Sequence, residues 1–333
     1  MLERKKWIDT IKGILIILVV IGHAGKNNLQ DNIKQIIFSF HMPVFFMISG
    51  YLLKLPIWGK LNIKKWLIKK IKKYFIPYVV YFFICSLLEK NLNIEYIVRF
   101  IWGGKLLPGA FWYITVLFLS EIILLCIEII SSWKTKLSIL AVLFVSQILY
   151  SRFLIPLAVS KIPIYFRFPW NADVSLIAVC FLAIGYYGKK HINKIVEGNN
   201  KYKNISIMVS LGIMIISFFM TYVGINPLYI DMKYSQYRGG LLVLLVPIAI
   251  SIILIKVSVV LSNYNVLNFI SEIGKISLII MYIHITIKNI LFIKIYGESF
   301  PIWMYIIVVI VISMLINKIQ KILISKYIFF RNS

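Results

Sequence analysis

Three residues that can carry charge or exchange protons occur in the first apolar stretch of the chain, Trp7 to His23. They are Asp9, Lys12 and His23. Lys12 and His23 are eleven residues apart, which at about 100° per residue is three turns plus about 20°, so a helix projects both from one face. Asp9 precedes Lys12 by three residues and joins that face. Charged groups inside a membrane-length helix usually line a bundle interior, a substrate path or a reaction centre.

The chemistry open to this stretch is proton transfer at a site poor in water. At about 1.5 Å rise per residue, Lys12 and His23 would be about 16 Å apart along the helix axis. Imidazole is the side chain best suited to take a proton from a hydroxyl near neutral pH. His41 lies in a second apolar run, FHMPVFFMISGY, and is expected at a depth similar to that of His23. In that run Ser49 and Gly50 permit close approach of another helix.

Simpler roles exist for the same residues. Lys12 could extend its ammonium to the membrane interface, with Asp9 as its neutralising partner. His23 could be an interface residue, and His41 could be hydrogen-bonded to a neighbour without meeting substrate. Trp112 could contact a ligand or belong to an aromatic belt. Asp173 could likewise contact a ligand or cap a helix.

Later runs add further polar groups. His284 and Lys288 are four residues apart and share a helix face, so they could line the same cavity or help to pack the bundle. Glu121 and Glu128 are seven residues apart, and either could face a cavity or pair with a lysine.

Composition decides the class of protein. Hydrophobic residues make up 60% of the 333 positions, and the mean hydropathy is +0.87, which indicates a polytopic membrane protein. The net charge of +25 lies in the gaps between apolar runs, so it does not predict nucleic-acid binding. The three cysteines show no spacing typical of a disulfide framework or a metal site.

Apolar runs and their breakers predict an all-α bundle of about ten transmembrane helices in one membrane-embedded domain, 1–333. The expected spans are 11–24, 33–53, 74–89, 111–130, 137–155, 174–188, 205–224, 239–255, 276–293 and 301–320.

Lysine and arginine alternate between rich and poor connections, and the positive-inside rule then places both termini in the cytoplasm. The lysine-rich segment 54–73 is expected to be an amphipathic helix on the cytoplasmic leaflet, attracted by anionic membrane lipids.

The chain resembles the acyltransferase 3 family of integral membrane proteins, in particular its branch of fucose 4-O-acetylase and related acetyltransferases. The resemblance rests on these blocks: WIDTIKG (7–13), VIGH (20–23), FHMPVFFMISGY (40–51), FWYI (111–114), PWNAD (169–173) and GKISLIIMYIH (274–284). The family's motif of a basic residue, ten residues and a histidine falls on Lys12 and His23, with lysine in place of the commoner arginine.

The resemblance implies an enzyme of the plasma (inner) membrane that moves an acyl group from cytoplasmic acyl-CoA to a sugar hydroxyl of a surface polysaccharide or lipid-linked glycan. It implies that His23 is catalytic, as general base or transient acyl carrier, with Lys12 on the donor side. Asp9, His41, Ser49, Trp112, Asp173 and His284 are the candidate substrate contacts. With a sugar as acceptor, Trp112 could stack on the sugar ring and Asp173 could orient the acceptor hydroxyl. Acetyl-CoA is the expected co-substrate, with succinyl as the alternative donor and no metal. A glycan exporter or flippase subunit is the competing hypothesis, and the oligomeric state stays open.

Overall fold

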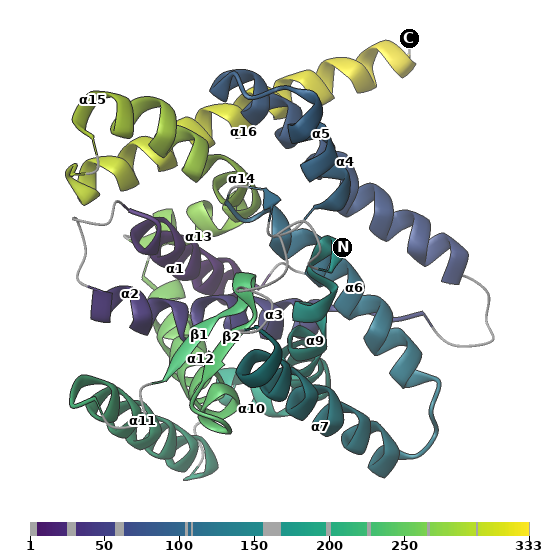
Figure 1. Ribbon diagram of the computed structural model, residues 1–333, viewed down its shortest axis with the longest axis vertical. Helices are drawn as coiled ribbons and strands as arrows, with labels where there is room; N and C mark the ends of the chain where they lie inside the picture. Colours follow the sequence, from purple (N-terminus) through teal and green to yellow (C-terminus); the bar gives the residue numbers. More distant parts are fainter. Residues whose placement is uncertain are drawn as a thin grey trace. The chain divides into compact units, whose positions relative to one another are not determined.

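The computed structural model describes residues 5–24, 31–56, 63–103, 106–107, 109–155, 168–197, 201–224, 228–264, 267–297 and 299–332 (Figure 1). The chain forms two compact units. Unit 1 combines 1–30 with 258–333, and unit 2 comprises 31–257.

Unit 1 is built on α1 (Lys6–Gly22), whose neighbours come from the other end of the chain. They are α13 (Asn268–Lys275), α14 (Ser277–Ile287) and α16 (Ile302–Asn332). A π-helix, Lys288–Ile293, and the short α15 (Lys294–Tyr296) continue α14.

Two glycines bring α1 and α13 into backbone contact. A Cβ atom added at Gly13 would lie 2.0 Å from the carbonyl oxygen of Ile270, and one at Gly274 would lie 1.7 Å from that of Asp9. No other residue type fits either position without moving a helix. Asp9 therefore faces α13 at close range.

Unit 2 contains the remaining helices. They are α2 (Asp31–Phe38), α3 (His41–Leu52), α4 (Ile63–Glu89), α5 (Ile94–Trp102), α6 (Phe111–Glu128), α7 (Trp133–Leu149), α9 (Ala172–Tyr187), α10 (Lys189–Glu197), α11 (Lys201–Tyr222) and most of α12 (Leu242–Ser262), whose residues from Ser258 onward are counted with unit 1. A π-helix, Tyr150–Leu154, extends α7, and a 3₁₀ turn, Pro169–Asn171, precedes α9. At the centre, α9 packs against α3, α6 and α7.

A small antiparallel hairpin before α12 departs from the all-α prediction. It pairs β1 (Tyr229–Asp231) with β2 (Gln236–Arg238), in a register that sets Ile230 opposite Tyr237. A 3₁₀ turn, Met232–Tyr234, joins the strands. The run between the predicted spans is too short and too polar to have signalled a strand pair by periodicity alone.

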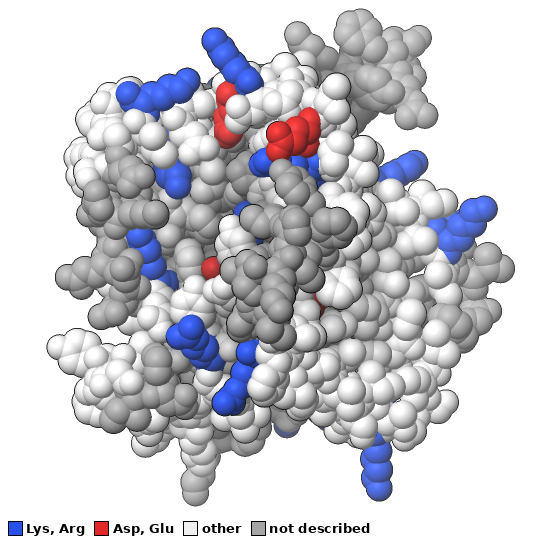
Figure 2. Space-filling view, in the orientation of Figure 1, with Lys and Arg blue, Asp and Glu red and all other residues white. Residues whose placement is uncertain are grey.

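The prediction of a polytopic helical membrane protein is confirmed. In the described ranges, nine helical segments have the length and apolarity to cross a bilayer, and they correspond to the second to tenth predicted spans. The segment that contains α4 begins at Ile63 rather than 74, and the segment that contains α12 ends at Ser262 rather than 255; the other bounds agree to within five residues. The first predicted span, 11–24, corresponds to α1, which begins earlier, at Lys6, and whose 17 residues are fewer than those of the other nine segments. Most of the described surface visible in Figure 2 is white, so it carries neither acidic nor basic side chains, as lipid contact requires.

The lysine-rich segment 54–73 does not form a separate helix in its described part. Residues 63–73 are the beginning of α4, which runs without a break to Glu89, and 57–62 lie outside the described residues. The attachment of this segment to the cytoplasmic leaflet stays a prediction, as does the cytoplasmic location of the termini.

Candidate active site

His23 ends α1, and its ring is oriented by its own helix. The Nδ1 atom lies 2.8 Å from the carbonyl oxygen of Val19, one turn earlier. A carbonyl oxygen can only accept a hydrogen bond, so in the neutral ring Nδ1 carries the proton and Nε2 holds the lone pair. The ring therefore presents a basic, nucleophilic nitrogen away from the helix. Half-burial of His23 leaves the residue accessible.

His284 of α14 lies against His23. The ring centroids are 5.1 Å apart and the planes meet at 78°, an edge-to-face arrangement. His284 is fully buried, and its Nδ1 atom lies 2.9 Å from the carbonyl oxygen of Ile280. Its Nε2 atom has no hydrogen-bond partner among the described residues. The His284 imidazole, whose buried Nε2 is unsatisfied among the described residues, thus adjoins the His23 imidazole. Buried polar atoms without a hydrogen bond are rare without a functional reason.

Lys288 joins the same cluster through the backbone. Its Nζ atom donates to the carbonyl oxygen of His23 at 3.0 Å, at the helix end where unpaired carbonyls favour a cation. Lys288 begins the π-helix that follows α14, and π-helical turns are frequent at functional sites. We call His23, His284 and Lys288 the histidine cluster.

Tyr305 of α16 holds the backbone of this cluster by a hydrogen bond. The Tyr305 hydroxyl donates to the carbonyl oxygen of His284 at 2.9 Å, and its side chain is fully buried. Sequence reasoning did not select Tyr305, because one more tyrosine in an apolar run carries no local signal.

Asp9 lies near the other end of α1, at a separate polar cavity of about 300 Å³. The cavity is lined by Lys6, Asp9, Asn268, Ser271, Glu272 and Lys275. Asp9 is buried, and Lys275 pairs with Glu272 at 2.5 Å. Lys12 is half-buried one turn beyond Asp9 and is not among the lining residues. We call this space the α1–α13 cavity.

The α13 residues of this cavity were not selected as site residues from the sequence, in which Lys275 occurs only as part of the block 274–284. The signal that could have found them is the polar face of Asn268–Lys275, in which Asn268, Ser271 and Lys275 recur at helical spacing.

Comparison with known proteins then decides the family. The acyltransferase 3 family model, described as an acyltransferase domain, matches residues 5–317. The chain belongs to the acyltransferase 3 family. No curated protein and no solved structure matches this acyltransferase. The chain is thus a multi-pass membrane acyltransferase, and α1 with its histidine lies inside the matched region.

In unit 2 of this acyltransferase, His41 begins α3 and repeats the geometry of the other two membrane histidines. Its Nδ1 atom lies 2.7 Å from the carbonyl oxygen of Ile37, and the residue is buried beside the ring of Phe38. Nε2 is again the basic nitrogen. A substrate contact at His41, and its expected proximity to His23, stay predictions.

Ser49 and Trp112 lie on the packed helices α3 and α6. The Ser49 hydroxyl is 3.0 Å from the hydroxyl of Tyr113, which connects the two helices. Trp112 is 5% exposed and meets Tyr113 edge to face. Because the indole is buried, sugar stacking on Trp112 would need access from the interior of the unit, and both roles stay predictions.

Asp173 lies in the first turn of α9 and accepts a hydrogen bond from the buried hydroxyl of Ser235, which follows the 3₁₀ turn of the hairpin. The side chain thus ties α9 to the hairpin. Tying α9 to the hairpin is a third role for Asp173, in addition to the helix capping and acceptor binding considered from the sequence. The contact holds a buried carboxylate at the beginning of α9.

Both glutamates of α6 pair with lysines. Glu121 accepts from Lys70 and from the Tyr74 hydroxyl, each at 2.7 Å. Glu128 pairs with Lys136 at 3.0 Å and accepts a hydrogen bond from Tyr187. Of the two alternatives left by the sequence, the structure selects pairing, which neutralises both carboxylates inside the bundle.

Proposed function

We propose that this acyltransferase is an O-acyltransferase that moves an acetyl group from cytoplasmic acetyl-CoA to a sugar hydroxyl of a surface polysaccharide or lipid-linked glycan. Its place would be the plasma (inner) membrane. The observation that carries the proposal is the orientation of His23, because the Nδ1 contact with Val19 leaves Nε2 as the basic atom.

His23 alone can carry out the proton transfers that the reaction needs. Nε2 of His23 accepts the proton of the acceptor hydroxyl while the hydroxyl oxygen attacks the thioester carbonyl. The carbon–sulfur bond breaks, the ester forms, and the CoA thiolate takes the proton from the imidazolium. In the alternative route, Nε2 itself attacks the carbonyl, the carbon–sulfur bond breaks, and the CoA thiolate leaves behind an acyl-imidazolium. The acceptor hydroxyl then attacks the acyl carbon, its proton passes to the thiolate, and the bond to Nε2 breaks to restore the neutral imidazole. Both routes need Nε2 unprotonated.

The α1–α13 cavity is our candidate for the donor phosphates. Lys6 offers an ammonium group there, Lys275 offers a second one beside its partner Glu272, and Ser271 and Asn268 offer neutral donors; Asp9 and Glu272 are the carboxylates of the same lining. Asp9 is fourteen residues before His23, a rise of about 21 Å along a helix. A donor with a long flexible arm could bind at one end of α1 and present its thioester at the other.

The test uses the full chain in its membrane. His23→Ala is compared with the unaltered protein by mass spectrometry of the surface glycan, which reports the acyl group and its acceptor. We expect the polymer to be exported without acyl groups. Loss of export with acyl groups intact would overturn the proposal in favour of an exporter, and a succinyl mass on the glycan would overturn the choice of acetyl.

A single-turnover experiment without acceptor distinguishes the two roles of His23, general base and acyl carrier. The purified protein is mixed with acetyl-CoA, quenched rapidly and measured by intact mass. An added acetyl group that is absent from His23→Ala supports the acyl-carrier route. Absence of the adduct in a protein that still acylates acceptor supports the general-base route.

A further inference from the structure

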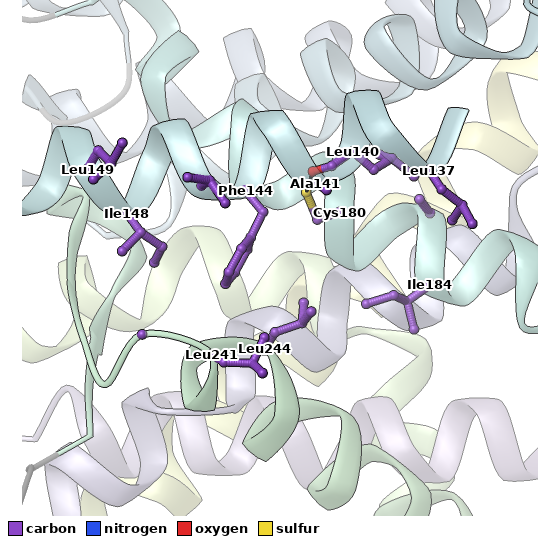
Figure 3. A pocket seen from close by; sticks show the side chains of 13 residues that line it. Leu137, Leu140, Ala141, Phe144, Ile148, Leu149, Cys180, Ile184, Leu241 and Leu244 are labelled. Atoms are coloured by element: carbon purple, nitrogen blue, oxygen red, sulfur yellow. Dashed lines mark hydrogen bonds between the residues drawn. The ribbon is translucent and has the colours of Figure 1, made fainter. Parts of the chain in front are cut away.

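Unit 2 carries an apolar groove between α7, α9 and the beginning of α12. Its volume is about 570 Å³, within the range of small-molecule sites. Phe144 and Leu140 of α7, Cys180 and Ile184 of α9, and Leu241 and Leu244 line it (Figure 3). In the figure, the Phe144 ring points from α7 toward Leu241 and Leu244. We call this space the apolar groove.

The groove opens on a surface that contacts lipid. Along α7 the side chains of Val142, Val145 and Leu149 are about half exposed or more, and Leu241 is 61% exposed. In a membrane-spanning helix such exposed apolar side chains face hydrocarbon. The occupant that the surroundings supply is therefore an acyl chain.

A polar pocket of about 480 Å³ adjoins the groove. Ile148 and Gly240 line both spaces. Ser151, Arg152, Gln236, Tyr237 and Arg238 complete much of the pocket. We call it the arginine pocket.

The arginine pocket is built by a connection between two elements. Ser151, in the π-helix that extends α7, accepts a hydrogen bond from the backbone N–H of Tyr237 in β2 at 2.7 Å. This contact holds Arg152 and Arg238 on adjoining elements. Both arginines are exposed, and in the described part of the chain no carboxylate forms an ion pair with either.

An apolar groove that leads along a membrane helix to two guanidinium groups matches an amphiphile with an anionic head. Guanidinium binds phosphate oxygens in bidentate fashion. We propose that unit 2 binds an anionic phospholipid, with one acyl chain in the apolar groove and the phosphate between Arg152 and Arg238. With the predicted topology, this is a lipid of the outer leaflet. The proposal does not depend on the acyl donor or acceptor.

The test measures phospholipid binding to the purified full chain by native mass spectrometry, with phosphatidylglycerol and phosphatidylcholine of the same acyl chains. We expect the unaltered chain to prefer phosphatidylglycerol. The double variant Arg152→Gln, Arg238→Gln should bind phosphatidylglycerol about tenfold more weakly, because losing a hydrogen bond to a charged group weakens binding by about this factor. Arg99→Gln is the matched control, because Arg99 is exposed and pairs with Glu95 on α5. It should bind as the unaltered chain does.

A second variant probes the groove independently. Ala141→Trp fills the space beside Phe144 and should weaken binding of both phospholipids, with monodisperse elution as the check of folding. Equal binding of the two lipids by the unaltered chain would overturn the proposal, as would unchanged binding in the double variant. Displacement of phosphatidylglycerol by an equimolar polyprenyl phosphate would overturn the phospholipid as occupant and assign the site to a lipid-linked substrate.

Discussion

His23, His41 and His284 share one device that fixes which ring nitrogen is basic. In each, Nδ1 meets the carbonyl oxygen of the residue four positions earlier, at 2.7 to 2.9 Å. The acceptor is the chain's own backbone, so the tautomer needs no partner side chain. In hydrocarbon surroundings this arrangement avoids a free-energy cost, because a partner side chain would be a further polar group to bury.

The edge-to-face pair of His23 and His284 predicts that the two act as a unit. We expect His23→Ala to lower kcat by about 10³-fold, in the range of general acid–base catalysis, and His284→Ala by about tenfold to a hundredfold. Adding His284→Ala to His23→Ala should then cost little more, because groups that act together are non-additive. The measurement is acetyl transfer by the three variants. Independent, multiplying effects would separate His284 from the reaction.

For Lys12 we expect an effect on the donor alone. Lys12→Ala should raise KM for acyl-CoA, while Lys12→Arg keeps much of the affinity because the charge is retained. Steady-state kinetics with varied acyl-CoA provide the measurement. Lys134→Ala, an exposed lysine at the beginning of α7, is the control and should leave KM unchanged. Equal donor kinetics in Lys12→Ala, Lys12→Arg and the unaltered protein would remove Lys12 from the site.

Among the helices, glycine determines which pairs meet backbone to backbone. In unit 2, a Cβ atom at Gly50 would lie 1.9 Å from the carbonyl oxygen of Leu182, and one at Gly185 would lie 1.9 Å from that of Met47. The expectation that Gly50 permits close helix approach is confirmed, and its partner is α9. The same construction at Gly13 and Gly274 joins α1 to α13 in unit 1.

We therefore expect Gly50→Ala and Gly185→Ala each to destabilise unit 2 by about 1–3 kcal/mol, as overpacking does. Thermal unfolding in detergent should show a lowered Tm for both. Gly212→Ala on α11 is the matched control, since nothing lies within 4 Å of its added Cβ. An unchanged Tm in the two variants would contradict the close crossing of α3 and α9.

The whole chain has an orientation that the lysine and arginine distribution predicts. Ser131, before α7, is expected on the cytoplasmic side, and Asn91, before α5, on the outer side; both are exposed. After replacement of Cys85, Cys126 and Cys180 by alanine, a membrane-impermeant thiol reagent on intact cells should label Asn91→Cys. Ser131→Cys should react only after permeabilisation. The reverse pattern would invert the topology and place the α1–α13 cavity outside.

The spans were predictable because the bilayer imposes a local rule. Backbone groups in hydrocarbon must be bonded within the segment, so each long apolar run can be assigned to a helix without knowledge of its neighbours. The runs around Phe111–Glu128 and Leu242–Ser262 needed no tertiary information. The hairpin of Tyr229–Arg238 did, since its pairing is decided by contacts between two short strands and the helix ends around them.

The sequence by itself determined that this is a membrane helical protein, placed Asp9, Lys12 and His23 on one helix face, and indicated the family. Only the tertiary structure decided that His284, rather than any other intramembrane group, lies beside His23, and that Lys70 and Lys136 neutralise Glu121 and Glu128. Helical periodicity relates residues of one helix to each other. A contact such as that of Lys288 with His23, 265 residues apart, depends on which helices pack together.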